Sequence, residues 1–184
     1  MNRQQLAHLV RAASTIVNDG EIVVIGSQAV LGSLDADALP EEATLSVEAD
    51  FAFFDDPDHD KADRVDGALG EYSQFHLTYQ YYAQGVELHT AVLPHGWEER
   101  LVTFARDDTS PGAAKCLEVH DLVISKLVAG REKDLTFTQA LMAHGIVDPA
   151  LLLARARTVD RPAAVVRRLA ALIERCATAA GNGR

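Results

Sequence analysis

The sequence lacks the patterns that mark disulfide-rich, zinc-binding and membrane-spanning proteins. Only two cysteines occur, Cys116 and Cys176, and they lie far apart with no C-x-x-C pattern. We therefore expect neither a disulfide framework nor a cysteine zinc site. The histidines show no H-E-x-x-H motif, and no apolar run approaches the ~18 residues that a membrane-spanning helix needs.

Positive charge is also scarce. The formal net charge is −10, which repels phosphate backbones at long range and argues against a general duplex-binding protein. This balance still permits a local basic patch, and it permits a nucleotide that arrives with magnesium. The N-terminal segment is amphipathic and has no continuous apolar core of the kind that signal peptides carry. We expect a cytoplasmic protein with no membrane contact.

Short apolar runs alternate with helical patterns through the first part of the chain. We predict helices before residue 18, after Ser27 and after residue 55, a loop at 34–43, and strands at 21–26, 46–54, 77–84, 85–93 and 101–105. Past Pro111-Gly112 the pattern is helical, with helices expected at 120–130 and 133–144 and from Asp148 and Arg161 onward.

This layout predicts an α+β fold, with a mixed sheet flanked by helices and a helical C-terminal part. We expect an α/β core over residues 1–112 and a helical region over residues 113–184 that packs on it.

Two acids interrupt an otherwise apolar strand in the stretch SVEADFAF. Because alternate residues of a strand share a face, Glu48 and Asp50 point the same way, with Cα atoms about 6.5–7 Å apart. Like charges repel, and burial increases the cost. Magnesium prefers oxygen ligands and relieves that cost. The simpler alternative is that both carboxylates lie on the solvated face of a sheet.

Three other features could likewise belong either to a ligand-binding site or to ordinary surface structure. Gly26 and Ser27 stand between a strand and a helix, where a phosphate can approach backbone N–H groups, although an ordinary turn with a serine cap has the same pattern. Glu87 and His89 share one face of the strand expected at 85–93. The segment DLVISKLVAGREKD places several charges in a short span, which is typical of a solvated helix face but also suits a triphosphate.

The order of these features resembles the nucleotidyltransferase superfamily built on the polymerase-beta core. The charged segment from Asp121 to Asp134 is similar to the Lys…Arg…Lys-Asp block of bacterial minimal nucleotidyltransferases and of the AbiEii-type toxins of abortive-infection and toxin–antitoxin systems. The resemblance covers about residues 20–145.

The resemblance implies a role for each motif. Gly26 and Ser27 would hold the triphosphate of a nucleoside triphosphate substrate, and Glu48, Asp50 and Glu87 would bind two Mg²⁺ ions as catalytic ligands. Lys126 would contact phosphate or the second substrate. Arg131, Lys133 and Asp134 would order the helical wall of the cleft. The reaction would move a nucleotidyl group to a hydroxyl and release pyrophosphate.

Departures from the family pattern keep other hypotheses open. The family usually has Asp where this chain has Glu48 and Glu87, and a displaced metal can cost on the order of 100-fold in rate. A degenerate member that binds a nucleotide or a protein partner, such as a cognate antitoxin, is the main alternative. An unrelated α+β protein with surface acids is another. The acceptor of an active enzyme could be a protein, an RNA or a small molecule.

Overall fold

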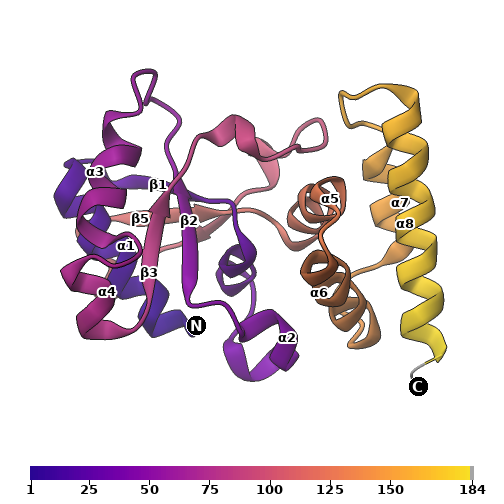
Figure 1. The fold of residues 1–184 in the computed structure, drawn as a ribbon, viewed down its shortest axis with the longest axis horizontal. Coiled ribbons are helices and arrows are strands. Elements are labelled where there is room, and N and C mark those ends of the chain that lie inside the picture. The colour runs from indigo at the N-terminus through magenta and orange to yellow at the C-terminus, as the bar shows by residue number, and fades with distance from the viewer. Residues whose placement is uncertain (183–184) are drawn as a thin grey trace.

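Five strands form one mixed sheet in the computed structural model, which describes residues 1–182 (Figure 1). Their order is β3-β2-β1-β5-β4, with bounds β1 (Glu21–Val24), β2 (Glu48–Ala52), β3 (Tyr82–Gly85), β4 (Val102–Phe104) and β5 (Ala113–Cys116). The neighbours β1–β5 and β2–β3 run parallel, whereas β1–β2 and β4–β5 run antiparallel. The predicted α+β class with a mixed sheet is confirmed.

Helices lie on both sides of the sheet. The helices α1 (Arg3–Val17), α3 (Asp60–Leu69) and α4 (Gln74–Tyr79) gather on one side, at the left of Figure 1. On the other side the 3-10 helix η1 (Ser27–Gly32) contacts β2, β5 and α2 (Glu41–Thr44). The sheet is therefore covered on both faces, which accounts for the fully buried strand residues Val23, Phe51 and Ala114.

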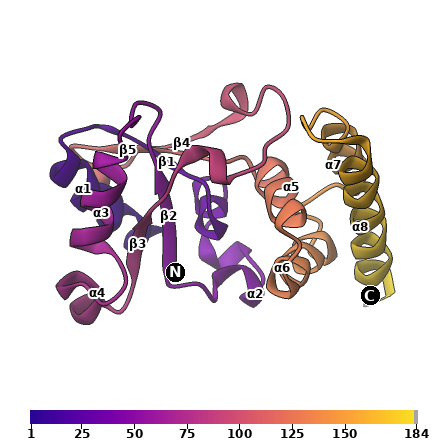
Figure 2. The ribbon, with the colours of Figure 1, turned by 45° about the horizontal axis from the view of Figure 1, so that its top comes forward.

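The C-terminal part is helical, as predicted. It holds α5 (Val119–Ala129), α6 (Glu132–Ala143), α7 (Pro149–Ala156) and α8 (Ala163–Asn182). Figures 1 and 2 show α5 and α6 between the sheet and α8, and α5 packs on η1 while α6 packs on α2. One cluster of buried apolar side chains extends from Leu6 through Phe51 to Ile173. The division at residue 112 stays a prediction, and β5 follows directly after it.

Several predicted elements differ from those observed. Of the strand expected at 77–84, residues 77–79 belong instead to α4, because Ser73 accepts a hydrogen bond from the backbone N–H of His76 and starts a helix. The strand expected at 85–93 is absent, since β3 ends at Gly85 and a 3-10 turn, η3 (Leu88–Thr90), follows. The loop expected at 34–43 contains α2 and a 3-10 turn, η2 (Ala36–Ala38). None of the helices among residues 1–182 is long and apolar enough to cross a bilayer.

A buried ion network joins the segment before β4 to the helical part. The Asp121 carboxylate, which has no exposed surface, accepts from Nε of Arg100 at 2.8 Å and from Nη1 of Arg155 at 2.8 Å. Arg155 also pairs with Glu118, which in turn binds Nδ1 of His120 at 2.7 Å. Burial acts to raise the pKa of Glu118, but His120 and Arg155 outweigh it and hold the pKa at about 2. The network fixes α5 against α7 and against the loop that holds Arg100.

We expect Asp121→Ala to lower the free energy of unfolding by about 3–5 kcal/mol, because it leaves two arginine side chains without their buried carboxylate. Chemical denaturation followed by circular dichroism measures the loss. Glu98→Ala, on an exposed residue near Arg100, is the control and should change stability by less than about 0.5 kcal/mol. A loss below about 1 kcal/mol in Asp121→Ala would show that the network behaves as an ordinary surface ion pair.

Candidate functional site

The acid pair lies on one face of β2, as the alternation of a strand requires. Ala49 and Phe51 point the other way and are fully buried, whereas Glu48 and Asp50 are partly buried. Tyr82 of β3 is the cross-strand neighbour of Glu48. Burial, and then the negative charge of Glu48, raise the pKa of the Tyr82 hydroxyl to about 12. Tyr82 is therefore a neutral neighbour of Glu48 near neutral pH.

Gly26 lies in direct contact with Asp50. The backbone N–H of Ile25 donates to the carbonyl of Asp50 at 3.1 Å, which draws the turn after β1 against β2. A Cβ atom built on Gly26 would lie 1.5 Å from Oδ2 of Asp50. Only glycine permits this approach. The glycine of the Gly26-Ser27 pair is thus required by the neighbouring carboxylate.

Ser27 does not cap a helix, contrary to the expectation. It is the first residue of η1, and Gly26 takes the cap position without a side-chain hydrogen bond. Because η1 is a six-residue 3-10 helix, its N-terminus contributes only a short stack of peptide dipoles. Any anion bound here depends mainly on charged side chains.

Those side chains come from α5 and α6. Asp134 has no exposed surface and accepts from Nζ of Lys126 at 3.3 Å and from Nε of Arg131 at 2.7 Å. It also accepts from the backbone N–H of Arg131 at 3.3 Å, which starts α6. Nζ of Lys126 lies 4.9 Å from the centre of the Phe137 ring. Asp134 therefore positions both cations.

Burial disfavours the charged forms of both Asp50 and Lys126. Burial, followed by the charge of Glu48, raises the pKa of Asp50, although Lys126, Arg131 and Lys133 oppose the rise. Burial lowers the pKa of Lys126, and Asp134 opposes that fall. Both groups would ionise more readily beside a bound charge of opposite sign.

Two connected hollows contain eight of the nine predicted site residues. A cavity of about 640 Å³ lies between β2 and α6 and is lined by Ser27, Glu42, Ala43, Leu45, Ser46, Glu48, Asp50, Lys126, Arg131, Glu132, Lys133, Asp134, Thr136 and Phe137; we call it the acid-pair cavity. A smaller hollow of about 370 Å³ adjoins it, and Gly26, Asp50, Lys126 and Arg131 are among its lining residues. The motifs separated in sequence thus meet around Asp50.

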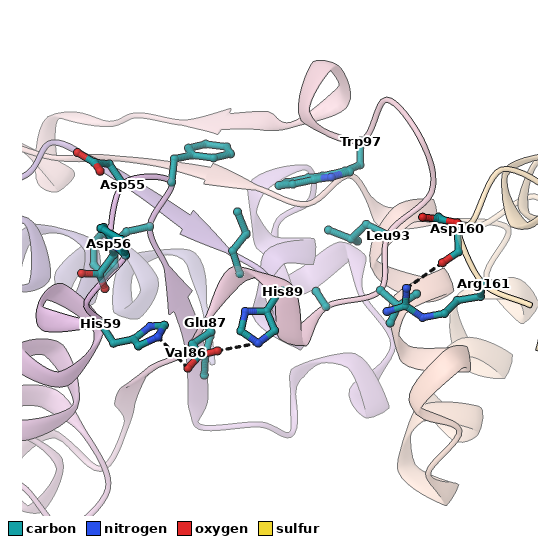
Figure 3. A pocket seen from close by; sticks show the side chains of 16 residues that line it. Asp55, Asp56, His59, Val86, Glu87, His89, Leu93, Trp97, Asp160 and Arg161 are labelled. Carbon is teal, nitrogen blue, oxygen red and sulfur yellow. Dashed lines mark hydrogen bonds and ion pairs between the residues drawn. The ribbon is translucent and has the colours of Figure 1, made fainter.

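Glu87 is the exception, and its expected place beside the acid pair is not met. The backbone N–H of Val86 donates to the carbonyl of Phe51 at 2.8 Å, so that Val86 continues the face of β3 nearest Asp50 and Glu87 turns to the opposite side. The Glu87 carboxylate instead pairs with His59 at 3.2 Å and with His89 at 2.7 Å (Figure 3). Among residues 1–182, no group of three or more His, Cys, Asp or Glu side chains is arranged to hold a metal ion.

Some lining residues had no signal in the sequence. Glu42 lies in α2 and Leu45 directly follows it, and α2 packs on α6. The sequence predicted neither residue as part of a site. Phe137 lies three residues after Asp134 on α6, a spacing that places it on the same side of the helix. The helical spacing could have identified Phe137, whereas Glu42 reaches the cavity only through tertiary packing.

We expect Gly26→Ala to destabilise the protein by about 1–3 kcal/mol, because the added Cβ forces the Asp50 carboxylate to move. Thermal and urea unfolding measure the change. The control is Gly67→Ala, in the middle of α3, where no atom lies within 4 Å of the added Cβ. That substitution should stabilise by about 0.5–1 kcal/mol, and equal effects of the two substitutions would contradict the steric account.

Comparison with known proteins agrees with the arrangement of these motifs. A family model described as a nucleotidyltransferase of unknown function (DUF6036) matches residues 4–165. No curated protein and no solved structure matches the chain. The match spans most of the sequence, including both strands that meet at Gly26 and Asp50 and the two helices that carry Lys126 and Asp134. The chain therefore belongs to this nucleotidyltransferase family of unknown function.

Proposed function

We propose that the protein transfers a nucleotidyl group from a nucleoside triphosphate to a hydroxyl acceptor, with Mg²⁺, and releases pyrophosphate. The observation that carries the proposal is the contact of the Asp50 carboxylate with Gly26, with Glu48 beside it and Lys126 and Arg131 lining the same cavity. Carboxylates for a metal and cations for phosphates thus share one hollow large enough for a nucleotide.

The chemistry of the acid pair fits magnesium. Glu48 and Asp50 offer oxygen ligands on one face of β2, and the raised pKa of Asp50 reflects burial and like-charge repulsion that a divalent cation would relieve. Magnesium is commonly held by one or two carboxylates together with substrate phosphates. When bound, the ion would neutralise charge on the phosphates and on the departing pyrophosphate.

The helical wall would bind the triphosphate. Lys126 is mostly buried and is held by Asp134, whereas Arg131 is more than half exposed and Lys133 is exposed. A phosphate chain beside Asp50 would draw on Lys126 and Arg131, whose orientation Asp134 already fixes. Pre-positioned cations stabilise charge that develops during transfer without reorganising at that moment.

A second candidate function is binding without turnover. It is favoured by the position of Glu87, which leaves only two of the three predicted metal ligands, Glu48 and Asp50, in the acid-pair cavity. A nucleotide-binding or protein-binding module would retain the acid-pair cavity but would not catalyse nucleotidyl transfer. The cytoplasmic location, the bacterial toxin–antitoxin or defence role and the cognate antitoxin remain predictions.

We expect Asp50→Asn to reduce magnesium-dependent pyrophosphate release by about 100-fold or more, because it removes an anionic oxygen ligand of the metal that would neutralise charge on the phosphates. The assay incubates the protein with Mg²⁺, cell extract and each labelled nucleoside triphosphate, and it follows both pyrophosphate and the labelled product. Asp58→Asn, in an exposed loop, is the control. A wild-type protein that is stabilised by a nucleotide but labels nothing would favour the binding module.

The same substitution should have the opposite effect on stability. Because the pKa of Asp50 is raised in the folded protein, its ionised form is destabilising above that pKa, and the cost fades as pH falls through it. We expect Asp50→Asn to raise the melting temperature at neutral pH without magnesium. The gain should shrink as pH falls toward the acidic range. A gain that is independent of pH would contradict this assignment of the charge.

A further inference from the structure

A second cavity of about 640 Å³ opens where β2 and β3 end. It lies between the loop after β2, the segment after β3 and the turn between α7 and α8. Figure 3 shows His59, Glu87 and His89 along one side, Trp97 along the opposite side, and Asp160 and Arg161 at one end. We call it the aromatic cavity. The reaction proposed above leaves it without a role.

Phe54 and Trp97 form a stacked aromatic pair in the lining of the aromatic cavity. The rings of Phe54 and Trp97 are nearly parallel, at an interplanar angle of 19°, and their centres lie 6.1 Å apart. Phe54 is 51% exposed although it is a large apolar residue. Trp97 is the sole tryptophan of the chain. Two adjacent aromatic faces that remain accessible suit a ligand with a ring, and they attract positive charge through their π-electrons.

The charge of this lining is negative. The lining residues include four acids, Asp55, Asp56, Glu87 and Asp160, against the single guanidinium of Arg161. Figure 3 shows the carboxylates of Asp55 and Asp56 turned away from Trp97. The Asp56 carboxylate accepts from the backbone N–H groups of Lys61 and Ala62 at the start of α3. Glu87, positioned by its two histidines, is the carboxylate that lies opposite Trp97 in Figure 3. Such a lining disfavours a polyanion and favours a cation.

The aromatic cavity shares part of its lining with the hollow that contains Asp50. Val86, Ala91 and Val92 line both this cavity and the small hollow that contains Gly26 and Asp50. Asp50, Lys126 and Arg131 line both that hollow and the acid-pair cavity. The aromatic cavity therefore neighbours the hollow that contains Asp50, where the proposed transfer would take place.

We propose that the aromatic cavity binds the acceptor, and that the acceptor is a small cationic molecule with a ring and a hydroxyl group. This inference rests on the proposed nucleotidyl transfer. The acceptor oxygen forms a bond to the α-phosphorus of the nucleoside triphosphate, and the bond from that phosphorus to the bridging oxygen breaks. Pyrophosphate leaves, and the hydroxyl proton passes to water. The negative lining selects against nucleic acid as the acceptor.

Three phenols of matched size test the selection by charge. Tyramine is cationic, para-ethylphenol is neutral and para-hydroxyphenylacetate is anionic. Each is titrated into the isotope-labelled full chain without nucleotide or metal, and the single indole N–H resonance, which comes from Trp97, reports binding. Since carboxylates attract an ammonium group and repel a carboxylate, we expect tyramine to bind about 10-fold or more tightly than the anion.

Two variants separate the ring from the charge. Glu87→Gln should reduce the ratio of the affinity for tyramine to the affinity for para-hydroxyphenylacetate. Phe54→Ala should weaken the binding of all three phenols by a similar factor, because all three would stack on the same ring. Tyr72→Ala removes an aromatic ring that is 76% exposed elsewhere and is the control for both. It should leave all three affinities unchanged.

The proposal is overturned if no phenol shifts the indole resonance up to its solubility limit, or if the anion binds as tightly as tyramine. A single-stranded oligoribonucleotide that shifts the resonance at lower concentration than tyramine would likewise overturn it. Because the titration contains neither nucleotide nor magnesium, its result is independent of pyrophosphate release. Failure here with intact pyrophosphate release would leave the proposed transfer standing and reject only the acceptor site.

Discussion

The contact between the Asp50 carboxylate and the backbone of Gly26 is the constraint on which the candidate site depends. It places a partly buried charge against a turn that has no room for a side chain. The hydrogen bond from Ile25 to the carbonyl of Asp50 keeps the two strands at this distance. The turn and the acid pair are therefore held in direct contact beside the acid-pair cavity.

The helical part contributes charge to that unit through one buried acid. Asp134 is fully buried, and burial acts to raise its pKa. Hydrogen bonds and charge from Arg131 and Lys126 outweigh burial, so the pKa is lowered and Asp134 remains ionised. Asp121, in the first turn of α5, is also fully buried and binds Arg100 and Arg155. One buried carboxylate thus orients the cations of the cavity, and the other fixes the helix that carries Lys126.

The arrangement of hollows gives the family assignment a physical interpretation. Cations and paired carboxylates line the acid-pair cavity, whereas aromatic rings and acids line the aromatic cavity, and Asp50 lines both the acid-pair cavity and the small hollow next to the aromatic cavity. Glu87 belongs to the aromatic cavity. A residue that the sequence suggested as a metal ligand is thereby placed where it can recognise a second molecule.

Local sequence patterns predicted much of the fold. The wrong secondary-structure predictions fell where a cap or pairing between distant strands determined the structure. The period of apolar residues located α1 and α3, because a helix repeats its buried face every few residues, and glycine and proline boundary signals located the four C-terminal helices. Residues 77–79 are rich in residues that favour strands, but they lie in α4, whose first turn the Ser73 side chain caps. The segment AAKC has no β-branched residue, and it forms β5 only because β1 and β4 pair with it on either side.

The sequence by itself determined that Glu48 and Asp50 share a face and that a glycine precedes η1, since both depend on neighbouring residues alone. The tertiary structure decided that Asp50 rests on Gly26, that Lys126 and Arg131 line its cavity, and that Glu87 does not join it. The physical reason is register: a strand changes face with every residue, so the hydrogen bond from Val86 to Phe51 sets which way Glu87 points. No local pattern encodes that pairing.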